Sequence, residues 1–242
     1  MNDVTDGLKN GSTALASPPF MSPRPPSLLA VCACLAVLAP AQDPVLAGRM
    51  ENGTYFSPTG EFKLVAPVLP ELGGRITDTE NVVTFSDDYD THLSIACFPQ
   101  DPLQKWELET RGLRDYLLYF FTDFVLADFQ RRFPGSSIES ARFVSELVDG
   151  ALIAYALLPG GSLFEDKNRV LNGPPENPVT AKRGTLLFVR QGYVYAISTE
   201  LAERATQRRT YNQPADAENN TLAARLTAVA NRLVFTGAKP KN

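Results

Sequence analysis

The sequence has few of the residues that carry most enzyme chemistry. Its 242 residues include three cysteines, one histidine and one tryptophan. Zinc sites take three or four ligands from the protein, so the single histidine, His92, is a poor basis for one. Cys32 and Cys34 lie in a leader-like segment, and a chain that loses this segment keeps only Cys97. Such a chain forms no internal disulfide, and its stability must come from its hydrophobic core.

Motifs for nucleotide binding and acyl transfer are also missing. The pairs Gly73-Gly74 and Gly160-Gly161 lack the spacing and the lysine of a phosphate-binding loop. No G-x-S-x-G motif occurs, and Ser162 has only the distant His92 to activate it. We interpret both glycine pairs as loops and predict no cofactor, no metal centre and no catalytic residue.

Positive charge is neither abundant nor concentrated. The formal net charge is -4 at pH 7, and basic residues gather only as isolated pairs such as Arg131-Arg132, Lys182-Arg183 and Arg208-Arg209. Binding to a phosphate backbone depends on a dense basic face that releases counterions. We therefore predict that the protein does not bind nucleic acid.

An N-terminal segment differs from the rest of the chain. Residues 21–41 contain one arginine, an apolar run over residues 28–39 and small residues up to Ala41, which is the layout of a secretory signal. The run is shorter than the roughly 20 residues that a membrane-spanning helix needs. We predict a leader over residues 1–41, cleavage after Ala41, a linker over residues 42–52, and export to the periplasm or cell envelope.

Two other outcomes for this segment stay open. Cys34 is a candidate for lipid modification, with only a short apolar stretch before it. Retention of the uncleaved leader is the other alternative. In each case the chain reaches the membrane only through the leader or through a lipid on Cys34.

The chain as a whole is 44% apolar and 21% charged, a composition typical of a globular protein, and we predict one domain over residues 53–238. Alternating apolar and polar residues indicate three strands, over residues 62–67, 82–86 and 91–98. A long helix is predicted from about Leu103 or Trp106 to Phe133, where Pro134-Gly135 would end it.

Two hairpins are predicted after this helix. Residues 137–158 contain two β-rich runs around Asp149-Gly150, and residues 183–199 contain two more around Gln191-Gly192. Residues 160–180 between them are predicted to be a loop. In the second hairpin one face carries Tyr193, Tyr195 and Ile197.

A last helix is predicted over residues 219–235. Its apolar stripe consists of Leu222, Leu226, Val229 and Leu233, and its cap would be Asn219, Asn220 or Thr221. Because hairpins pair antiparallel, the predicted fold class is α+β. A mostly antiparallel sheet of hairpins would carry one long central helix and one C-terminal helix packed on it.

The order of these elements and several short stretches resemble those of a known superfamily. The stretches are YFSP at residues 55–58, GEFKL at 60–64, the mid-chain helix, the segment 141–150, GYVY at 192–195, and a last helix ending in LVF at 233–235. They resemble the PsbP-like superfamily over residues 53–238. The resemblance implies an α/β/α sandwich and an accessory or binding role more than catalysis.

The only histidine and the only cysteine outside the leader both lie in the stretch DDYDTHLSIACF at residues 87–98. If residues 91–98 form a strand, alternation places His92 and Cys97 on opposite faces, about 16 Å apart at roughly 3.3 Å per residue. A thiolate-imidazole dyad needs hydrogen-bond contact, so the two residues do not form one. Cys97 is interpreted as a small buried apolar residue.

The turn before this strand is rich in carboxylates. Asp87, Asp88, Asp90 and His92 form a candidate site for a cation or another ligand, because carboxylate oxygens bind hard cations. The segment lacks the central glycine of a calcium loop, and aspartate also favours turns by itself. The alternative is therefore a solvated hairpin turn.

The predicted long helix carries more apolar surface than one sheet face covers. One stripe holds Trp106, Leu113, Leu117, Phe120 and Phe124, and further apolar residues are Tyr116, Leu118, Tyr119, Phe121, Val125 and Phe129. A helix that is apolar nearly all round is either covered on two sides or presents a patch to a partner. Residues 160–180 or the linker would supply the cover. A partner would contact Tyr119, Phe121 and Val125.

These inferences predict an exported, non-catalytic accessory or binding module of the bacterial cell envelope, which binds an envelope protein partner or a small ligand. The enzyme alternative is a hydrolase or metal-dependent activity centred on the turn from Asp87 to His92. That alternative requires a concave pocket into which His92 and at least two carboxylates converge.

Overall fold

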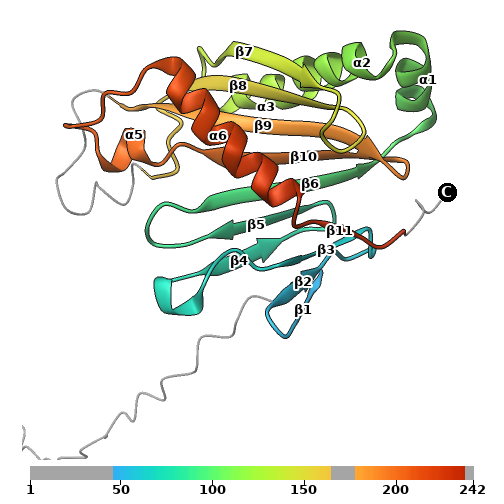
Figure 1. The fold of residues 1–242 in the computed structure, drawn as a ribbon, viewed down its shortest axis with the longest axis horizontal. Coiled ribbons are helices and arrows are strands. Elements are labelled where there is room, and N and C mark those ends of the chain that lie inside the picture. Colours follow the sequence, from blue (N-terminus) through green and yellow to red (C-terminus); the bar gives the residue numbers. More distant parts are fainter. Residues whose placement is uncertain (1–45, 165–177, 238–242) are drawn as a thin grey trace, which may run out of the picture. The chain divides into compact units, whose positions relative to one another are not determined.

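The strands form two antiparallel sheets, one of seven strands and one of four (Figure 1). The computed structural model describes residues 46–164 and 178–237, so the predicted leader with Cys34 lies outside the described residues. Contacts divide the chain into residues 1–42 and 43–242, and every described residue belongs to the second unit. Within the described part of the chain, no helix is both long enough and apolar enough to span a membrane.

The larger sheet has the strand order β4-β5-β6-β10-β9-β8-β7. Its strands are β4 (Arg75–Asp78), β5 (Val82–Ser86), β6 (His92–Pro99), β7 (Ser137–Val144), β8 (Ala151–Pro159), β9 (Thr180–Arg190) and β10 (Tyr193–Glu200). The two predicted hairpins are confirmed as β7-β8 and β9-β10. The pairing of β6 with β10 joins the early strands to the late ones.

The smaller sheet has the order β1-β2-β3-β11, with β1 (Arg49–Glu51), β2 (Thr54–Phe56), β3 (Phe62–Val65) and β11 (Val234–Phe235). A short 3-10 helix, η1 (Pro70–Leu72), follows β3. Strand β1 falls within residues 42–52, so regular structure begins inside the predicted linker. Asp78 of β4 ties this region to the larger sheet, because its carboxylate accepts hydrogen bonds from Tyr55 Oη and from the backbone N–H groups of Ala47 and Gly48.

The β9-β10 turn has the chemistry that its sequence predicts. Gln191 and Gly192 both have positive φ, 53° and 82°, as a two-residue primed turn requires. The β7-β8 connection is longer than the predicted two-residue turn, because Val148 (φ 52°) adopts the left-handed region together with Asp149 (φ 64°) before Gly150.

The predicted long helix is broken, which corrects the prediction of one continuous element. The segment consists of α1 (Pro102–Arg111), α2 (Leu113–Phe120), a π-helical stretch η2 (Phe121–Leu126) and α3 (Ala127–Arg132). Gly112 has φ 76° and ψ 162°, a backbone conformation that ends α1 and that glycine tolerates best. The segment begins at Pro102, one residue before the earlier of the two predicted starts, and Asp101 caps it by accepting a hydrogen bond from the Gln104 N–H.

The C-terminal helix α6 (Ala215–Ala230) follows the short helix α5 (Glu203–Thr206) and begins four residues before the predicted cap. Capping by Asn219, Asn220 or Thr221 is therefore wrong. The tertiary structure extends the helix, because Glu218 in its first turn is buried against a lysine of the sheet.

Helices lie on both faces of the larger sheet (Figure 1). On one side, which we call the α6 face, Leu222 and Leu226 pack in a core cluster that also contains residues of the smaller sheet. On the other, which we call the α2–α3 face, Leu117 and Phe120 pack in a second cluster with β8 to β10. The predicted alternation of β6 is confirmed: Leu93, Ile95 and Cys97 belong to the α6 face, as do Tyr193, Tyr195 and Ile197.

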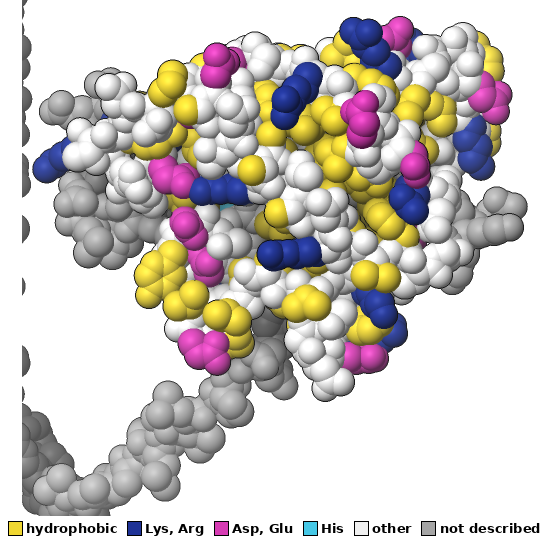
Figure 2. Space-filling view, viewed as in Figure 1, with side chains coloured by type: hydrophobic (Ala, Val, Ile, Leu, Met, Phe, Trp, Pro, Cys, Tyr) yellow, Lys and Arg dark blue, Asp and Glu magenta, His cyan; other side chains and the backbone are white. Residues whose placement is uncertain are grey.

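The surface on the α6 side carries charge of both signs. Figure 2 shows Lys and Arg side chains interspersed with Asp and Glu on this side, without a gathering of basic side chains.

Candidate functional site

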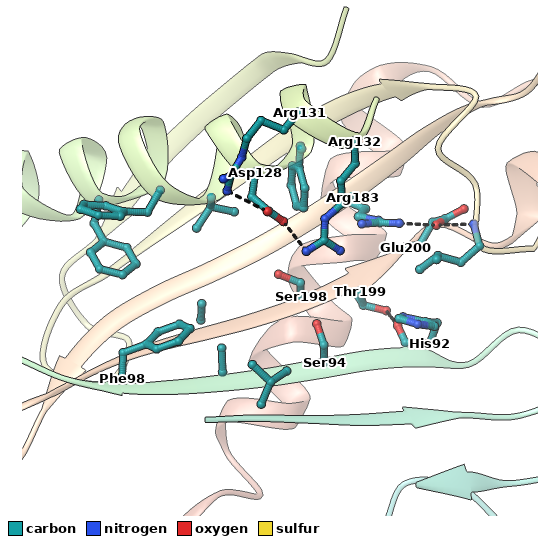
Figure 3. Close-up of a pocket in the computed structure, with 18 of the residues that line it drawn as sticks. His92, Ser94, Phe98, Asp128, Arg131, Arg132, Arg183, Ser198, Thr199 and Glu200 are labelled. Carbon is teal, nitrogen blue, oxygen red and sulfur yellow. Dashed lines mark hydrogen bonds and ion pairs between the residues drawn. The ribbon is translucent and has the colours of Figure 1, made fainter. Parts of the chain in front are cut away.

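A cavity of about 590 Å³ lies on the α2–α3 face, between the sheet and the helical segment (Figure 3). Its sheet wall includes His92, Ser94, Ala96 and Phe98 of β6, Ala196, Ser198, Thr199 and Glu200 of β10, and Arg183 of β9. Its helical wall includes Phe120, Phe124, Val125, Asp128, Phe129, Arg131 and Arg132. The cavity thus brings together residues from strands and helices that are far apart in the sequence.

Small side chains on two neighbouring strands leave the space for this cavity. The strand register pairs Ser94 with Ser198 and Ala96 with Ala196, so four small residues meet on the face that the helices cover. A sheet and a helix are normally kept apart by interlocking larger side chains at close to crystal density. Where the central pairs are Ser and Ala, the helix rests on its neighbours and a void remains.

One end of the cavity is apolar. Phe98 of β6 lines the cavity together with Phe120, Phe124 and Val125, and the ring centroids of Phe120 and Phe124 are 4.9 Å apart. Phe124 is 44% exposed and therefore also reaches the surface. Phe124 and Val125 belong to the π-helical stretch η2, a local form that often occurs at functional sites.

The other end is polar and is built around Arg183 and Glu200 (Figure 3). The Glu200 carboxylate, only 1% exposed, accepts hydrogen bonds from Ser162 Oγ at 2.6 Å and from the Leu163 N–H at 3.0 Å. Its Oε2 atom lies 3.6 Å from Arg183 Nη2, which donates to the Gly161 carbonyl at 3.1 Å. Glu200 therefore holds both the arginine and the loop over residues 161–164 in place.

A second charged group lies at the helical side of the same end. The Asp128 carboxylate accepts from Arg131 Nη2 at 3.0 Å and pairs with Arg132 Nη2, also at 3.0 Å. Both arginine side chains are largely exposed, at 76% and 69%. Exposed pairs of this kind are readily exchanged for other partners, because each contributes little to stability.

Burial shifts the charge properties of the inner pair. Burial raises the pKa of Glu200, although Ser162, Leu163 and Arg183 act in the opposite direction. Burial also lowers the pKa of Arg183, an effect that Glu200 opposes and that the positive charge of Arg132 reinforces. The two arginines are thus near enough to repel each other.

The candidate cation site at the turn from Asp87 to His92 is not one cluster. Asp87 Oδ1 accepts from the N–H groups of Tyr89, Asp90 and Thr91 at 2.9, 3.1 and 3.0 Å, which is the geometry of an aspartate that closes its own turn. Burial alone would raise the pKa of Asp87, but these hydrogen bonds outweigh it and lower the pKa.

The other members of that candidate site point elsewhere. Asp88 forms an ion pair with Arg75, and neither it nor Asp90 lines the cavity. Only His92 does so, and its carbonyl accepts a hydrogen bond from Thr199 Oγ1 at 3.0 Å. Among the described residues, no three His, Cys, Asp or Glu side chains form a group that could hold a metal ion.

The three residues predicted to bind a partner do not share one exposed patch. Phe121 is fully buried in the core of the α2–α3 face, so its expected exposure to a partner is corrected. The interruption at Gly112 and the π-helical stretch rotate the residues that follow, which a continuous helix would not do. Tyr119 and Val125 are half-buried, whereas Leu118 (42%) and Phe124 (44%) are exposed.

Sequence reasoning missed the arginines and Glu200. Arg131-Arg132 and Lys182-Arg183 were interpreted as isolated basic pairs, and Glu200 drew no attention at the end of a predicted strand. One signal was available: Lys182 and Arg183 are consecutive in a strand, so one cation must lie on each face of the sheet.

Lys182, which precedes Arg183 in β9, lies in an ion network on the α6 face. It is fully buried, and its Nζ atom lies 3.0 Å from Glu218 Oε2 and 2.5 Å from Glu139 Oε2. Arg204 donates to both carboxylate oxygens of Glu218, at 2.7 and 3.1 Å. Burial would raise the pKa of Glu218, but Arg204 and Lys182 outweigh it and lower the pKa.

No protein-family model matches the chain, and a comparison with curated proteins finds no match. Among solved structures, it is similar to cyanobacterial PsbP (CyanoP) from Synechocystis sp. PCC 6803, with 14% identity and a TM-score of 0.45, over 75% of this chain and 91% of that one. It is also similar to the Ran-binding protein Mog1p from Saccharomyces cerevisiae, with 12% identity and a TM-score of 0.42, over 77% and 96% of the two chains. These likenesses concern the fold alone, and they include a structure of the PsbP kind that the sequence resemblance names.

Proposed function

We propose that this protein is an exported, non-catalytic binding module of the bacterial cell envelope, and that the cavity on the α2–α3 face is its binding site. The observation that carries the proposal is the cavity itself. At about 590 Å³ it falls within the range of roughly 300–1,000 Å³ that is usual for small-molecule sites. Its apolar end supplies contact area and its polar end supplies a few oriented groups, the usual division of such sites.

The arrangement of the carboxylates favours binding over catalysis. A general base must offer an oxygen that can take a proton from a substrate. Both oxygens of Glu200 already accept hydrogen bonds, and Asp128 is shared by two arginines. Asp87, on which the enzyme alternative depends, is used to close its own turn.

A titration followed by two-dimensional NMR tests the binding site. The fluorescent probe 1-anilinonaphthalene-8-sulfonate, an aromatic monoanion, should shift amide signals of β6, β10 and η2 and gain fluorescence. Ala96→Leu should remove most of this response, because the added side chain occupies the space beside Ala196. Asp88→Ala, outside the cavity, should stay folded and keep the response. Shifts confined to other strands, or a full response in Ala96→Leu, would contradict the assignment.

Export is the part of the proposal that the sequence alone supports. Mass spectrometry of the protein isolated from fractionated cells should find an N-terminus at Gln42 in the envelope or periplasmic fraction. An intact Met1 in the cytoplasmic fraction would remove this part and leave the binding site untouched.

A protein partner on the outer surface of the helical segment is the second candidate. The exposed side chain of Leu118 supports it, next to the half-buried Tyr119. Leu118 is not among the cavity residues, so Leu118→Glu separates the two functions. If a partner binds here, crosslinking in native cells should capture it with the wild type and lose it with Leu118→Glu, while the probe still enters the cavity.

A further inference from the structure

The polar end of the cavity has one positive charge more than its carboxylates neutralise. Its lining contains Arg131, Arg132 and Arg183 against Asp128 and Glu200, three cations against two anions among the described residues. Arg131 and Arg132 are largely exposed, so solvent screens much of this surplus until a ligand covers it. A single negative charge on a ligand would complete the balance.

Arg183 has hydrogen-bonding capacity left over. Its Nε–H is buried and has no acceptor among the described residues, while Nη2 is used by Gly161 and lies near Glu200. Buried polar groups in proteins are nearly always satisfied, so Arg183, whose side chain lines the cavity, is an incompletely bonded cation. A carboxylate is the acceptor that best matches a guanidinium fork.

Arg132 adds a second, movable guanidinium. Its side chain is 69% exposed at the helical edge, and in Figure 3 it extends from α3 toward Arg183 and Ser198. Asp128 would keep Arg131 as its partner if Arg132 turned to a ligand. An anion bound between Arg132 and Arg183 would attract both guanidinium groups and offset their mutual repulsion.

The opposite end accepts an apolar body. Phe98, Phe120 and Phe124 line it, and the floor between the two ends consists of the Ala96–Ala196 and Ser94–Ser198 pairs. This floor has no large side chain that would divide the cavity. A ligand can therefore reach from the arginines to the phenylalanines.

We propose that the ligand is a small carboxylic acid with an apolar body, an inference that rests on the proposed binding function. Its carboxylate lies between Arg132 and Arg183, and its apolar body lies over Ala96 and Ala196 against the phenylalanines. The surplus of one charge favours a monoanion such as a carboxylate over a phosphate monoester, which carries close to two charges at neutral pH.

Calorimetric and NMR titrations with octanoate, octanol, octylammonium, octyl phosphate and acetate test this assignment at pH 7. Octanoate should bind about tenfold or more tightly than octanol, because the alcohol has neither the negative charge nor the second oxygen that pair with a guanidinium. Octylammonium should bind more weakly still, and acetate should show no measurable binding. Arg132→Gln should weaken octanoate by about tenfold and leave octanol unchanged.

Arg232→Gln is the matched control, an exposed arginine outside the cavity, and should change nothing. Arg183→Gln is less suitable, since it would leave buried Glu200 without its cation. Equal affinity for octanoate and octanol, or an unchanged octanoate affinity in Arg132→Gln, would overturn the acid assignment while the cavity remains a binding site. Tighter binding of octyl phosphate would overturn the choice of carboxylate. A lack of signal shifts with every octyl probe and with the fluorescent probe would instead remove the proposed function.

Discussion

The two faces of the seven-stranded sheet treat buried charge differently. On the α6 face, Lys182 and Glu218 lie in an ion network in which Lys182 pairs with Glu218 and Glu139, and Glu218 also accepts hydrogen bonds from Arg204. On the α2–α3 face, the neighbouring residue Arg183 lies farther from Glu200, at 3.6 Å, and one of its N–H groups has no acceptor among the described residues. Strand β9 thus places Lys182, which has two carboxylate partners, on one face, and Arg183, which is incompletely hydrogen-bonded among the described residues, on the other.

The packing also differs, being tight on the α6 face and incomplete on the α2–α3 face. Gly184 of β9 allows α6 to approach so closely that an added Cβ would lie 3.0 Å from Leu226 and 3.1 Å from Leu222. Opposite α2 and η2, the small residues Ala96 and Ala196 border the cavity instead. Small residues therefore allow close packing on the α6 face and border a cavity on the α2–α3 face. The difference depends on how closely the helix over each face approaches the sheet. The closed face stabilises the fold, and the open face has room for a ligand.

The largest expected difference comes from breaking a charge pair on each face. Glu218→Gln should lower the free energy of unfolding by about 3–5 kcal/mol, because it removes a counter-charge from fully buried Lys182. Asp128→Asn should cost less than about 1 kcal/mol, since its arginine partners are exposed. Urea unfolding followed by circular dichroism measures both. Equal losses of unfolding free energy in the two variants would show that the charge pairs on the two faces contribute equally to stability.

A smaller difference is expected from filling space. Gly184→Leu should destabilise the protein by about 2 kcal/mol through overpacking beneath α6. Ala96→Leu adds a larger side chain on the opposite face but should change stability by less than about 1 kcal/mol, because the cavity accommodates it. Thermal unfolding of the two variants checks the order. If Ala96→Leu proved the more damaging change, the cavity would not be open in solution.

The smallest effect concerns acid. Glu218 has a lowered pKa, so its contribution to stability is present above the ordinary value of 4.5 and is lost as the pH falls through its folded-state pKa. Glu200 has a raised pKa, so its contribution is complete below 4.5 and is lost as the pH rises through its folded-state pKa. Glu218→Gln should therefore flatten the loss of stability in acid, and Glu200→Gln should steepen it.

Carboxyl ¹³C NMR titrations of the two glutamates give the same comparison directly. Glu200 should titrate at a higher pH than Glu218. The reverse order would mean that the effect of burial on the pKa outweighs that of the partner charges at Glu218 and not at Glu200.

Much of the sheet could be predicted from local patterns. Strand β5 has the predicted bounds, β6 has the predicted inward residues, and the Gln191-Gly192 turn has the predicted φ signs. These features depend on alternation and on turn chemistry over a few residues. The start of α6 and the break at Gly112 were mispredicted. A buried ion pair with a distant strand sets the first, and one backbone conformation sets the second.

The candidate site was predictable only in fragments. His92 was singled out for its rarity, and it does line the cavity, but the carboxylates expected beside it belong to a turn. Glu200 and Arg183 are cross-strand partners in the β9-β10 hairpin, 17 residues apart, whereas Arg132 lies 51 residues before Arg183 and joins them only because α3 crosses above the sheet. Their individual sequence contexts are ordinary.

The sequence by itself determined the α+β class, the hairpins, the inward faces of the strands and the small core-facing thiol of Cys97. These follow from periodicity, which is a property of neighbours along the chain. The tertiary structure decided which small residues lie in register, where the helix breaks and which arginine has an N–H without an acceptor among the described residues. Each depends on contacts between distant segments, and the free energy of those contacts is set by what lies opposite a residue and not by what lies beside it.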